Sequence, residues 1–432
     1  MGFLENLANS SVNKKGVVKV PEHIKFNKEQ QEAIEDIKRF LDSNETYYCL
    51  KGKGGTGKTT VISGALEGRN NILGVTISHK AKERLSESIM QCNTFASACG
   101  MKVIQNEIGE QEFVLNEYAK SIPISEANFI VIDECSMISK EGVNIVEELR
   151  KNSSKVIYMG DFRQLPPIDE GGADSVTFKI KNTSNLTERI RQGVGNPIIK
   201  LSDVIASEIE TKNFDPYVIQ DHLIDNINEE GKGYNYVDDS DFIEKFVADF
   251  KEDKTTKFIS FRTATVGKYN KLIRETIYKG VKDIFVKDEL IIANKSYFIG
   301  DEVILKNSVE YFVESYKKSH IMNFECSILS LKDVESDIPV LTKKGRIAYN
   351  KELKHLSSKK MWKKFWQLKP MFAEIDYGYA INTHKSQGST YKNVYIDFND
   401  ILSVTKITDK EKCQSLYVAI TRASFNLHLL DI

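Results

Sequence analysis

A glycine-rich loop between an apolar run and a helix-compatible segment constrains this chain more than any other feature. Residues 50–60 read LKGKGGTGKTT, after the strand-like run 47–50 and before the helix-compatible segment 61–66. In this context the pattern G-x-x-x-x-G-K-[ST] predicts a phosphate-binding loop. Its glycines, among them Gly55 and Gly57, let backbone N–H groups and a helix N-terminus point at phosphate oxygens. We therefore expect a nucleoside triphosphate site here.

The side chains that this chemistry requires are present at the expected spacings. Lys58 can reach the β- and γ-phosphates, the Thr59 hydroxyl can bind Mg²⁺, and Thr60 extends the same turn. The apolar run 129–132 ends in Asp133 and Glu134. We assign Asp133 to the Mg²⁺ shell and Glu134 to activation of the attacking water. The alternatives are a chance glycine-rich turn and an ordinary acidic strand end. Because the loop and the acidic pair occur together, an ATP and Mg²⁺ site is favoured.

Composition bounds the class of protein. The chain has 432 residues, 41% of them hydrophobic and 28% charged, which predicts a globular protein of two to four domains. Residues 1–24 are polar and are expected to be a leader without a secretory signal. Six scattered cysteines without a C-x-x-C pair fit a reducing cytoplasm, and Cys49 and Cys135 are expected in the core. A net charge of −1 gives no overall nucleic-acid signature.

Buried strands alternate with amphipathic helices along the first half of the chain. The patterns predict strands at 71–77 and 155–159 and helices at 80–90 and 142–149, besides a helix starting at Asn27. Such alternation indicates an α/β domain with a parallel sheet. A β-hairpin insertion is expected at 100–118. Residues from about 289 to 342 are rich in strand patterns and predict a β-barrel insertion in a second α/β domain.

Three further motifs carry polar groups at strand or helix ends. GDFRQLPP at 160–167 places Gln164 where an amide can sense a γ-phosphate. AINTHKSQGST at 380–390 concentrates donors suited to nucleic-acid or nucleotide phosphates. LYVAITRA at 416–423 ends an apolar run with Arg422. A lone arginine is usually a surface charge, but the other motifs favour a nucleotide contact.

The order GKGGTGKTT, VIDE, GDFRQLPP, AINTHKSQGST and YVAITRA resembles the superfamily 1 DNA helicases of the RecD-like branch, over residues 26–423. The resemblance implies two RecA-like parallel-sheet domains, at 25–180 and 181–432, with ATP between them and single-stranded DNA across both. It also implies the hairpin in the first domain and an SH3-like β-barrel with a basic extension, about 289–375, in the second.

The resemblance assigns further residues to the nucleotide. Gln30 is similar to the glutamine that reads the adenine edge, with an ordinary surface glutamine as the alternative. Gly388 belongs to the nucleotide-binding loop of the second domain. Arg191, in LTERIRQ, matches the arginine that touches the γ-phosphate, and we expect Arg191 and Arg422 to act as a pair from the second domain.

The resemblance also assigns DNA contacts. These are Ser78 and His79 in VTISHKA, Thr94 in NTF, and Thr383 and His384 in THKSQG. The family usually has proline where this chain has Ile77, and histidine where it has Ala96.

Two candidate DNA-binding features leave alternatives open. Phe113 is either a strand-separating wedge or the core of its own hairpin. Residues 343–364 combine many lysines with a single acid, and Trp362 and Trp366 follow at i, i+4 spacing. This segment either tracks a DNA backbone or is a solvated helix face docked through its tryptophans.

Together these features predict an ATP-dependent 5′→3′ translocase and helicase acting on single-stranded DNA and on single-strand/duplex junctions. We expect a cytoplasmic monomer without membrane contact, with single-strand-binding or replication proteins as candidate partners. The rivals are a DNA-stimulated ATPase that remodels protein–DNA complexes without separating strands, and a P-loop NTPase acting on a small molecule or a protein. THKSQG and VAITRA count against the last, whereas RNA as a substrate stays open.

Overall fold

The structure, a computed structural model, describes residue 18 and residues 25–105, 111–116, 119, 121–190, 195–222, 224–300 and 302–430. The expected leader, 1–24, therefore lies outside the described residues apart from Val18. The chain forms two compact units. The first comprises Met1–Gly195, Ile205–Asp215 and Lys406–Tyr417, and the second comprises Asn196–Val204, Pro216–Thr405 and Val418–Ile432.

The first unit is built on a six-stranded parallel sheet in the order β3-β2-β6-β7-β1-β8. Its strands are β1 (Tyr47–Gly52), β2 (Ile72–Thr76), β3 (Cys92–Thr94), β6 (Phe129–Ile132), β7 (Lys155–Gly160) and β8 (Thr183–Leu186). The domain boundary expected after residue 180 falls too early. The strand pairing explains the later boundary. All four residues of β8 pair with β1, at Cys49 to Gly52, so β8 belongs to the sheet of the first unit.

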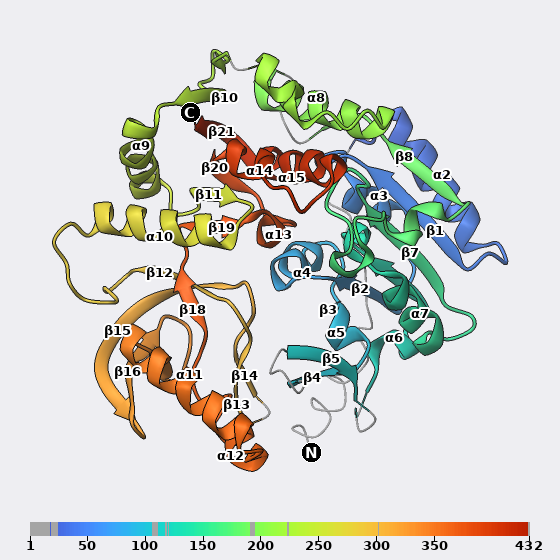
Figure 1. Cartoon of the computed structure of the whole chain (residues 1–432). Coiled ribbons are helices and arrows are strands. Elements are labelled where there is room, and N and C mark those ends of the chain that lie inside the picture. The colour runs from blue at the N-terminus through green and yellow to red at the C-terminus, as the bar shows by residue number, and fades with distance from the viewer. Residues whose placement is uncertain are drawn as a thin grey trace, which may run out of the picture. The chain divides into compact units, whose positions relative to one another are not determined.

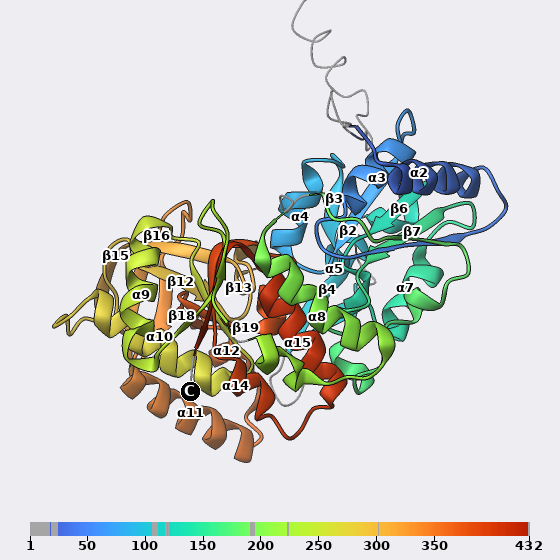
Figure 2. The same cartoon turned by 90° about the horizontal axis from the view of Figure 1, so that it is seen from above.

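Helices cover both faces of this sheet, as Figures 1 and 2 show. One face packs against α2 (Lys28–Leu41), α3 (Lys58–Ala65) and α4 (His79–Ser86). The other packs against α5 (Phe95–Ala98), α6 (Pro123–Glu126) and α7 (Lys140–Leu149). The expected apolar face of α2 is confirmed: its buried residues include Ala33, Ile34, Ile37 and Leu41. Cys49 and Cys135 are fully buried in this core, as expected.

A two-stranded antiparallel hairpin follows α5 in the chain. It consists of β4 (Met101–Gln105) and β5 (Gln111–Leu115), with Met101 opposite Leu115 and Val103 opposite Phe113. Its connecting residues, 106–110, are outside the described part of the chain. The position of the expected insertion, 100–118, thus agrees with an observed pair of strands.

The second unit contains another six-stranded sheet, in the order β19-β11-β20-β21-β10-β9, parallel except for β9. The strands are β9 (Asn226–Ile227), β10 (Gly233–Val237), β11 (Lys257–Ser260), β19 (Ala380–Asn382), β20 (Tyr391–Ile396) and β21 (Ala423–Leu430). Aromatic side chains of α9 (Asp239–Glu252) and α10 (Thr263–Ile277) pack with residues of this sheet. The second unit also contains α13 (Thr383–Ser386) and α14 (Phe398–Leu402), whereas α8 (Pro197–Thr211) and α15 (Asp409–Thr421) each have residues in both units.

An antiparallel module is inserted between α10 and β19. A five-stranded sheet in the order β17-β16-β15-β12-β18 is joined by the pair β13-β14. The strands are β12 (Leu290–Ala293), β13 (Tyr297–Ile299), β14 (Glu302–Leu305), β15 (Glu310–Ile321), β16 (Phe324–Leu331), β17 (Ile338–Leu341) and β18 (Ile375–Tyr377). Two helices, α11 (Lys343–Ser358) and α12 (Trp362–Leu368), pack onto the module through a cluster that includes Phe324, Tyr349 and Phe365.

Short 3₁₀ helices at Cys135–Met137, Ile168–Glu170, Val176–Lys179 and Pro216–His222 complete the described elements. Within the described residues, no helix has the length and apolar character needed to cross a membrane.

Candidate nucleotide and DNA sites

The phosphate-binding loop lies between the end of β1 and the start of α3, as predicted. Gly55 and Gly57 have φ values of 83° and 82°, the left-handed region that favours glycine. Gly57 caps α3 without a side-chain hydrogen bond, so the helix N-terminus keeps backbone donors for an anion. The Lys58 ammonium donates to the carbonyls of Gly52 (2.7 Å) and Lys53 (3.1 Å), which holds it over the loop. Thr59 and Thr60 are partly exposed in the first turn of α3.

Gln30 is a buried part of this loop's support, not a surface residue. Its Nε2 donates to the Thr56 carbonyl (3.1 Å), and its Oε1 accepts from the Asn27 backbone N–H (3.2 Å). A Cβ atom at Gly57 would lie 2.5 Å from Gln30 Nε2, so a larger residue there would displace the Gln30 amide. Both ends of the Gln30 amide are therefore occupied by the loop and by the N-terminus of α2. Contact with an adenine edge would require one of these bonds to be exchanged.

The predicted carboxylate pair lies at the end of β6. Glu134 adopts φ 55°, and its backbone N–H donates to Asp133 Oδ1 (2.8 Å). Burial raises the pKa of Asp133 to about 6, with the negative charge of Glu134 as the next contribution, while Arg84 and Lys58 oppose the rise. A bound divalent cation would favour the ionised form of Asp133.

The available donors fit Mg²⁺. No group of three or more His, Cys, Asp or Glu side chains among the described residues could hold a metal by itself. Magnesium is usually held by one or two carboxylates together with substrate phosphates and water, not by an all-protein cage. One carboxylate from Asp133 and one hydroxyl from Thr59, completed by phosphate oxygens, meet that requirement.

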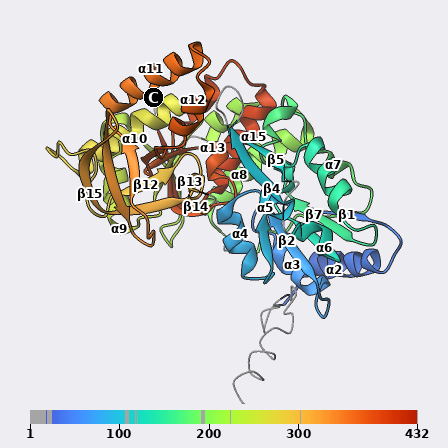
Figure 3. The ribbon, with the colours of Figure 1, turned by 90° about the horizontal axis from the view of Figure 1, so that it is seen from below.

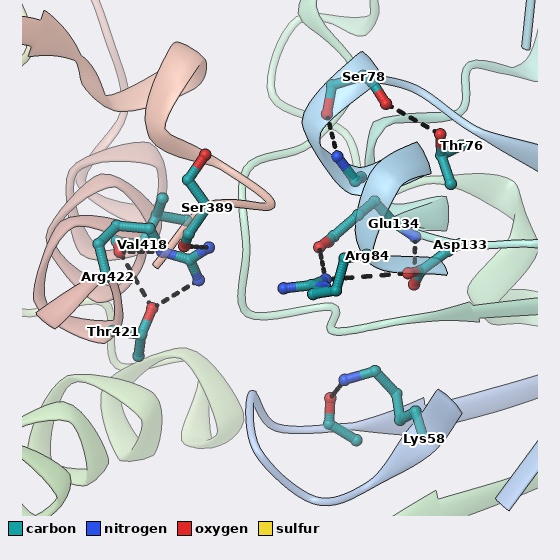
Figure 4. Close-up of polar contacts among 12 residues, drawn as sticks. Lys58, Thr76, Ser78, Arg84, Asp133, Glu134, Ser389, Val418, Thr421 and Arg422 are labelled. Atoms are coloured by element: carbon teal, nitrogen blue, oxygen red, sulfur yellow. Dashed lines mark hydrogen bonds and ion pairs between the residues drawn. The ribbon is translucent and has the colours of Figure 1, made fainter. Parts of the chain in front are cut away.

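Arg84 was not among the predicted site residues. It lies in the last turn of α4, with its guanidinium 3.4 Å from Glu134 Oε1 and 3.9 Å from Asp133 Oδ2 (Figure 4). No local sequence pattern signals this pairing, which depends on the order of strands in the sheet. Because β2 and β6 are neighbours in the sheet, the helix that follows β2 starts beside the acidic end of β6.

The GDFRQLPP motif forms a buried polar cluster around its aspartate and arginine. Arg163 contacts Asp161 (2.7 Å) and Glu210 of α8 (2.5 Å), and the Tyr417 hydroxyl donates to Asp161 Oδ2 (2.7 Å). Asp161, Arg163 and Tyr417 are all at most 2% exposed. Gln164, the predicted γ-phosphate sensor, is itself buried, and its backbone N–H donates to the Asp161 carbonyl (3.0 Å). The cluster fixes the backbone at Gln164.

Three of the predicted DNA-binding residues lie at helix starts beyond β2 and β3. Ser78 caps α4 by accepting from the Ala81 N–H (3.1 Å), and Thr94 caps α5 by accepting from the Ser97 N–H (3.4 Å). His79 is the first residue of α4 and is partly exposed. Each hydroxyl accepts a hydrogen bond from its own helix and keeps its O–H, so it can still donate to an external phosphate, as can backbone N–H groups at the helix starts.

In the second unit, the THKSQG segment forms the start of α13. His384 is partly exposed and its ring lies 5.9 Å from that of Phe261. Thr383, by contrast, is fully buried and donates its hydroxyl to the Ser260 carbonyl (3.2 Å). Gly388 has φ 75°, again a conformation that favours glycine. Only the imidazole of this pair is thus placed to meet solvent.

Arg422 is buried within the second unit. Its guanidinium donates to the carbonyls of Val418 and Ser389 and to the Thr421 hydroxyl, each at 3.0 Å (Figure 4). Arg191 lies outside the described residues. Its neighbour Ile190, however, belongs to the first unit and donates its N–H to the Gly55 carbonyl (2.9 Å). The described part of this motif, residues 186–190, belongs to the first unit. The expectation that the motif comes from the second domain is therefore wrong for these residues.

Phe113 is 59% exposed on β5, so the alternative that it forms the core of its hairpin is wrong. The two tryptophans behave differently from each other. Trp366 packs with the cluster beneath α12, whereas Trp362 is 42% exposed.

Comparison with known proteins agrees with these motifs. Residues 25–226 match the family model of an AAA domain, and residues 377–430 match that of the UvrD-like helicase C-terminal domain. An uncharacterized protein of Acanthamoeba polyphaga mimivirus is 28% identical, over 93% of this chain and 99% of its own length. The ATP-dependent DNA helicase dda of Enterobacteria phage T4 is 22% identical, over 92% of this chain and 97% of its own.

Among solved structures, the Pif1 helicase from Bacteroides in complex with ADP-AlF3 and single-stranded DNA has a TM-score of 0.52. It is 15% identical and aligns over 94% of this chain and 92% of its own, which shows a shared fold. The family matches, the full-length relatives and the shared fold identify the chain as a superfamily 1 helicase, an ATP-hydrolysing enzyme related to the RecD-like branch.

Proposed function

We propose that this protein is a DNA helicase that moves 5′→3′ on single-stranded DNA and couples ATP hydrolysis to unwinding of the duplex. The observation that carries the proposal is the combination, in one unit, of a P-loop with a partly exposed Lys58 and the adjacent carboxylates Asp133 and Glu134. The family model of an AAA domain matches the segment containing this site, and that of the UvrD-like helicase C-terminal domain matches the C-terminal segment. The dda relative, called an ATP-dependent DNA helicase, supports ATP and DNA as the substrates.

The chain's own residues divide the chemistry as follows. Lys58 and the N-terminus of α3 neutralise the β- and γ-phosphates, while Asp133 and the Thr59 hydroxyl would hold Mg²⁺, which would offset charge on the phosphate oxygens. Glu134 takes a proton from the attacking water, and the γ-phosphoryl group leaves the β-phosphate oxygen. Gln164, on a backbone fixed by the Asp161 cluster, would respond to the γ-phosphate.

Arg191 and Arg422 are proposed as the cations that meet charge developing on the γ-phosphate, because a guanidinium donates bidentately to phosphate oxygens. For Arg191 the support is that its neighbour Ile190 bonds to the P-loop at Gly55. Arg422 would have to exchange its contacts with Val418 and Ser389. A nucleotide-bound structure with either guanidinium far from the γ-phosphate would remove that residue from the mechanism.

The DNA strand is proposed to contact Ser78, His79, Thr94, Thr383 and His384, with the hydroxyls of Ser78 and Thr94 and the two imidazoles as side-chain donors. The burial of the Thr383 hydroxyl leaves that residue its backbone as the means of contact. We propose the antiparallel module as an SH3-like fold and the β4–β5 hairpin as the strand-separating pin. The exposure of Phe113 supports its role as the wedge.

Tailed duplexes test this function. We expect a duplex with a 5′ single-stranded tail to be unwound with ATP and Mg²⁺, and a duplex with only a 3′ tail to stay paired. Strand separation would be followed by fluorophore–quencher release, with a blunt duplex as the control. Unwinding from the 3′ tail alone would contradict the polarity. ATPase stimulated by single-stranded DNA without unwinding of either substrate would instead support remodelling of protein–DNA complexes.

A further inference from the structure

A segment of the inserted module carries a charge that the motor chemistry does not use. Residues 343–369 contain nine lysines and one arginine against a single acid, Glu352, a net charge of +9. Because the whole chain has a net charge of −1, the remaining residues together carry −10. A net positive charge is therefore concentrated on α11, α12 and the turn between them.

The structure places these lysines on one exposed surface. Along α11, Lys343, Lys344, Lys351 and Lys354 fall on the side of the helix opposite the buried Gly345, Tyr349 and Leu356. Lys359, Lys360, Lys363 and Lys364 continue the exposed surface through the turn and into α12. We call these eight lysines the basic face. Figures 1 and 3 show the two helices following one another along the module.

The basic face is held in place by tight packing beneath it. A Cβ atom at Gly345 would lie 1.9 Å from the Glu325 carbonyl oxygen of β16, so α11 rests directly on that strand. Thr342 caps the helix by accepting from the Gly345 N–H (3.0 Å). The apolar sides of α11 and α12 bury Tyr349 and Phe365 against the module. None of these packing contacts involves the lysines. The folding of the module therefore does not account for their position on one exposed surface.

Few carboxylates neutralise this surface. Within the described residues, Lys344 is the member of the basic face with an acid in ion-pair range, Glu325 at 3.9 Å, and that lysine is 88% exposed. Aligned ammonium groups repel one another, and a polyanion removes that repulsion. Apolar side chains are also exposed among the lysines: Ile347 is 73% exposed and Trp362 is 42% exposed.

Duplex DNA is the polyanion that fits best. A helix of 16 residues is about 24 Å long, the length over which one strand of a duplex presents about seven phosphates. Lysine ammonium groups are point charges that bind phosphate without reading bases, which suits contact at any sequence. A duplex carries twice the charge per length of one of its strands and is straight over this distance, like α11.

We infer that the basic face is a second DNA-binding surface, which holds the phosphate backbone of the duplex and not the strand on which the motor moves. The inference rests on the proposed helicase function, since it is the duplex at a junction that would be held. It is separable from that function, because binding of a blunt duplex requires neither ATP nor a single-stranded tail.

The test compares two fourfold variants of the full chain. The first carries Lys343→Gln, Lys344→Gln, Lys351→Gln and Lys354→Gln, which keep helix propensity and remove four charges. The matched control carries Lys251→Gln, Lys271→Gln, Lys279→Gln and Lys282→Gln, exposed lysines of the same unit that lie outside the basic face. Binding of a fluorescent blunt duplex and of a single-stranded oligonucleotide is measured without nucleotide over a series of KCl concentrations.

For the first variant we expect duplex affinity to fall at least tenfold. The slope of log affinity against log salt should shrink by about 0.9 for each phosphate that the variant no longer neutralises. Single-strand affinity and single-strand-stimulated ATPase should stay within about twofold. The control variant should bind both ligands like the parent. Trp362 and Trp366 are the chain's only tryptophans, so duplex binding should also change intrinsic tryptophan fluorescence.

Unchanged duplex affinity and salt slope in the first variant would overturn the inference. Equal reductions for duplex and single strand would overturn it too, because the surface would then belong to the motor strand. Failure of the proposed function has a different signature, namely a parent protein whose ATPase does not respond to single-stranded DNA.

Discussion

Lys58→Ala is expected to lower ATP turnover about 10³-fold and to abolish unwinding, since it removes the cation that offsets charge on the β- and γ-phosphates. The ammonium also bonds to the Gly52 and Lys53 carbonyls, so the loop loses an internal support along with its charge. Steady-state ATPase with saturating single-stranded DNA measures the effect, and thermal unfolding of the variant checks that the fold is retained.

Lys53→Ala is the matched control for this substitution. It removes a lysine from the same loop, but one whose ammonium lies 3.7 Å from Glu210. We expect its turnover to stay within about tenfold of the parent. If Lys58→Ala kept near-normal turnover, or if the two variants lost activity equally, the assignment of Lys58 to the phosphates would be wrong.

The elements that were predictable from sequence are those determined by neighbouring residues. The P-loop, the strand ending at Asp133 and the buried face of α2 each depend on local periodicity and on glycine or capping positions. Such signals also located the hairpin at β4 and β5. Their chemistry could therefore be assigned before any three-dimensional arrangement was known.

Contacts between distant segments could not be predicted in the same way. Arg84 is 50 residues from Glu134, and Tyr417 is 256 residues from Asp161. These pairs depend on which strands become neighbours, and no local pattern encodes that. The late end of the first unit has the same origin, since β8 adds to the sheet beside β1.

The direction in which a side chain points could not be predicted from the sequence either. Motif matching assigns both Thr383 and His384 to DNA, but consecutive side chains of a helix point about 100° apart, so the two need not share an environment. Thr383 points into the second unit and His384 is partly exposed. Gln30 was similarly read as a ligand contact or a surface residue, whereas its amide supports the P-loop. In both cases the burial of the side chain, of Thr383 and of Gln30, determines which groups it contacts.

Glu134→Gln is expected to separate nucleotide binding from hydrolysis. The amide cannot take a proton from water, so ATPase should fall about 10²-fold or more. Its oxygen can still accept from Arg84, which lies 3.4 Å from Glu134 Oε1, so the local structure should persist. Binding of a fluorescent ATP analogue in the presence of Mg²⁺ should therefore remain close to that of the parent.

Asp133→Asn is the comparison that makes this result specific. The neutral amide weakens the Mg²⁺ shell, so this variant should lose Mg²⁺-dependent nucleotide binding as well as hydrolysis. Two isosteric changes at adjacent positions then differ in one readout, the affinity for the ATP analogue. If Glu134→Gln also lost that affinity, Glu134 would be a metal ligand or a structural partner of Arg84, and the water would need a different base. Retained binding without turnover would leave Glu134 as the group that activates the water.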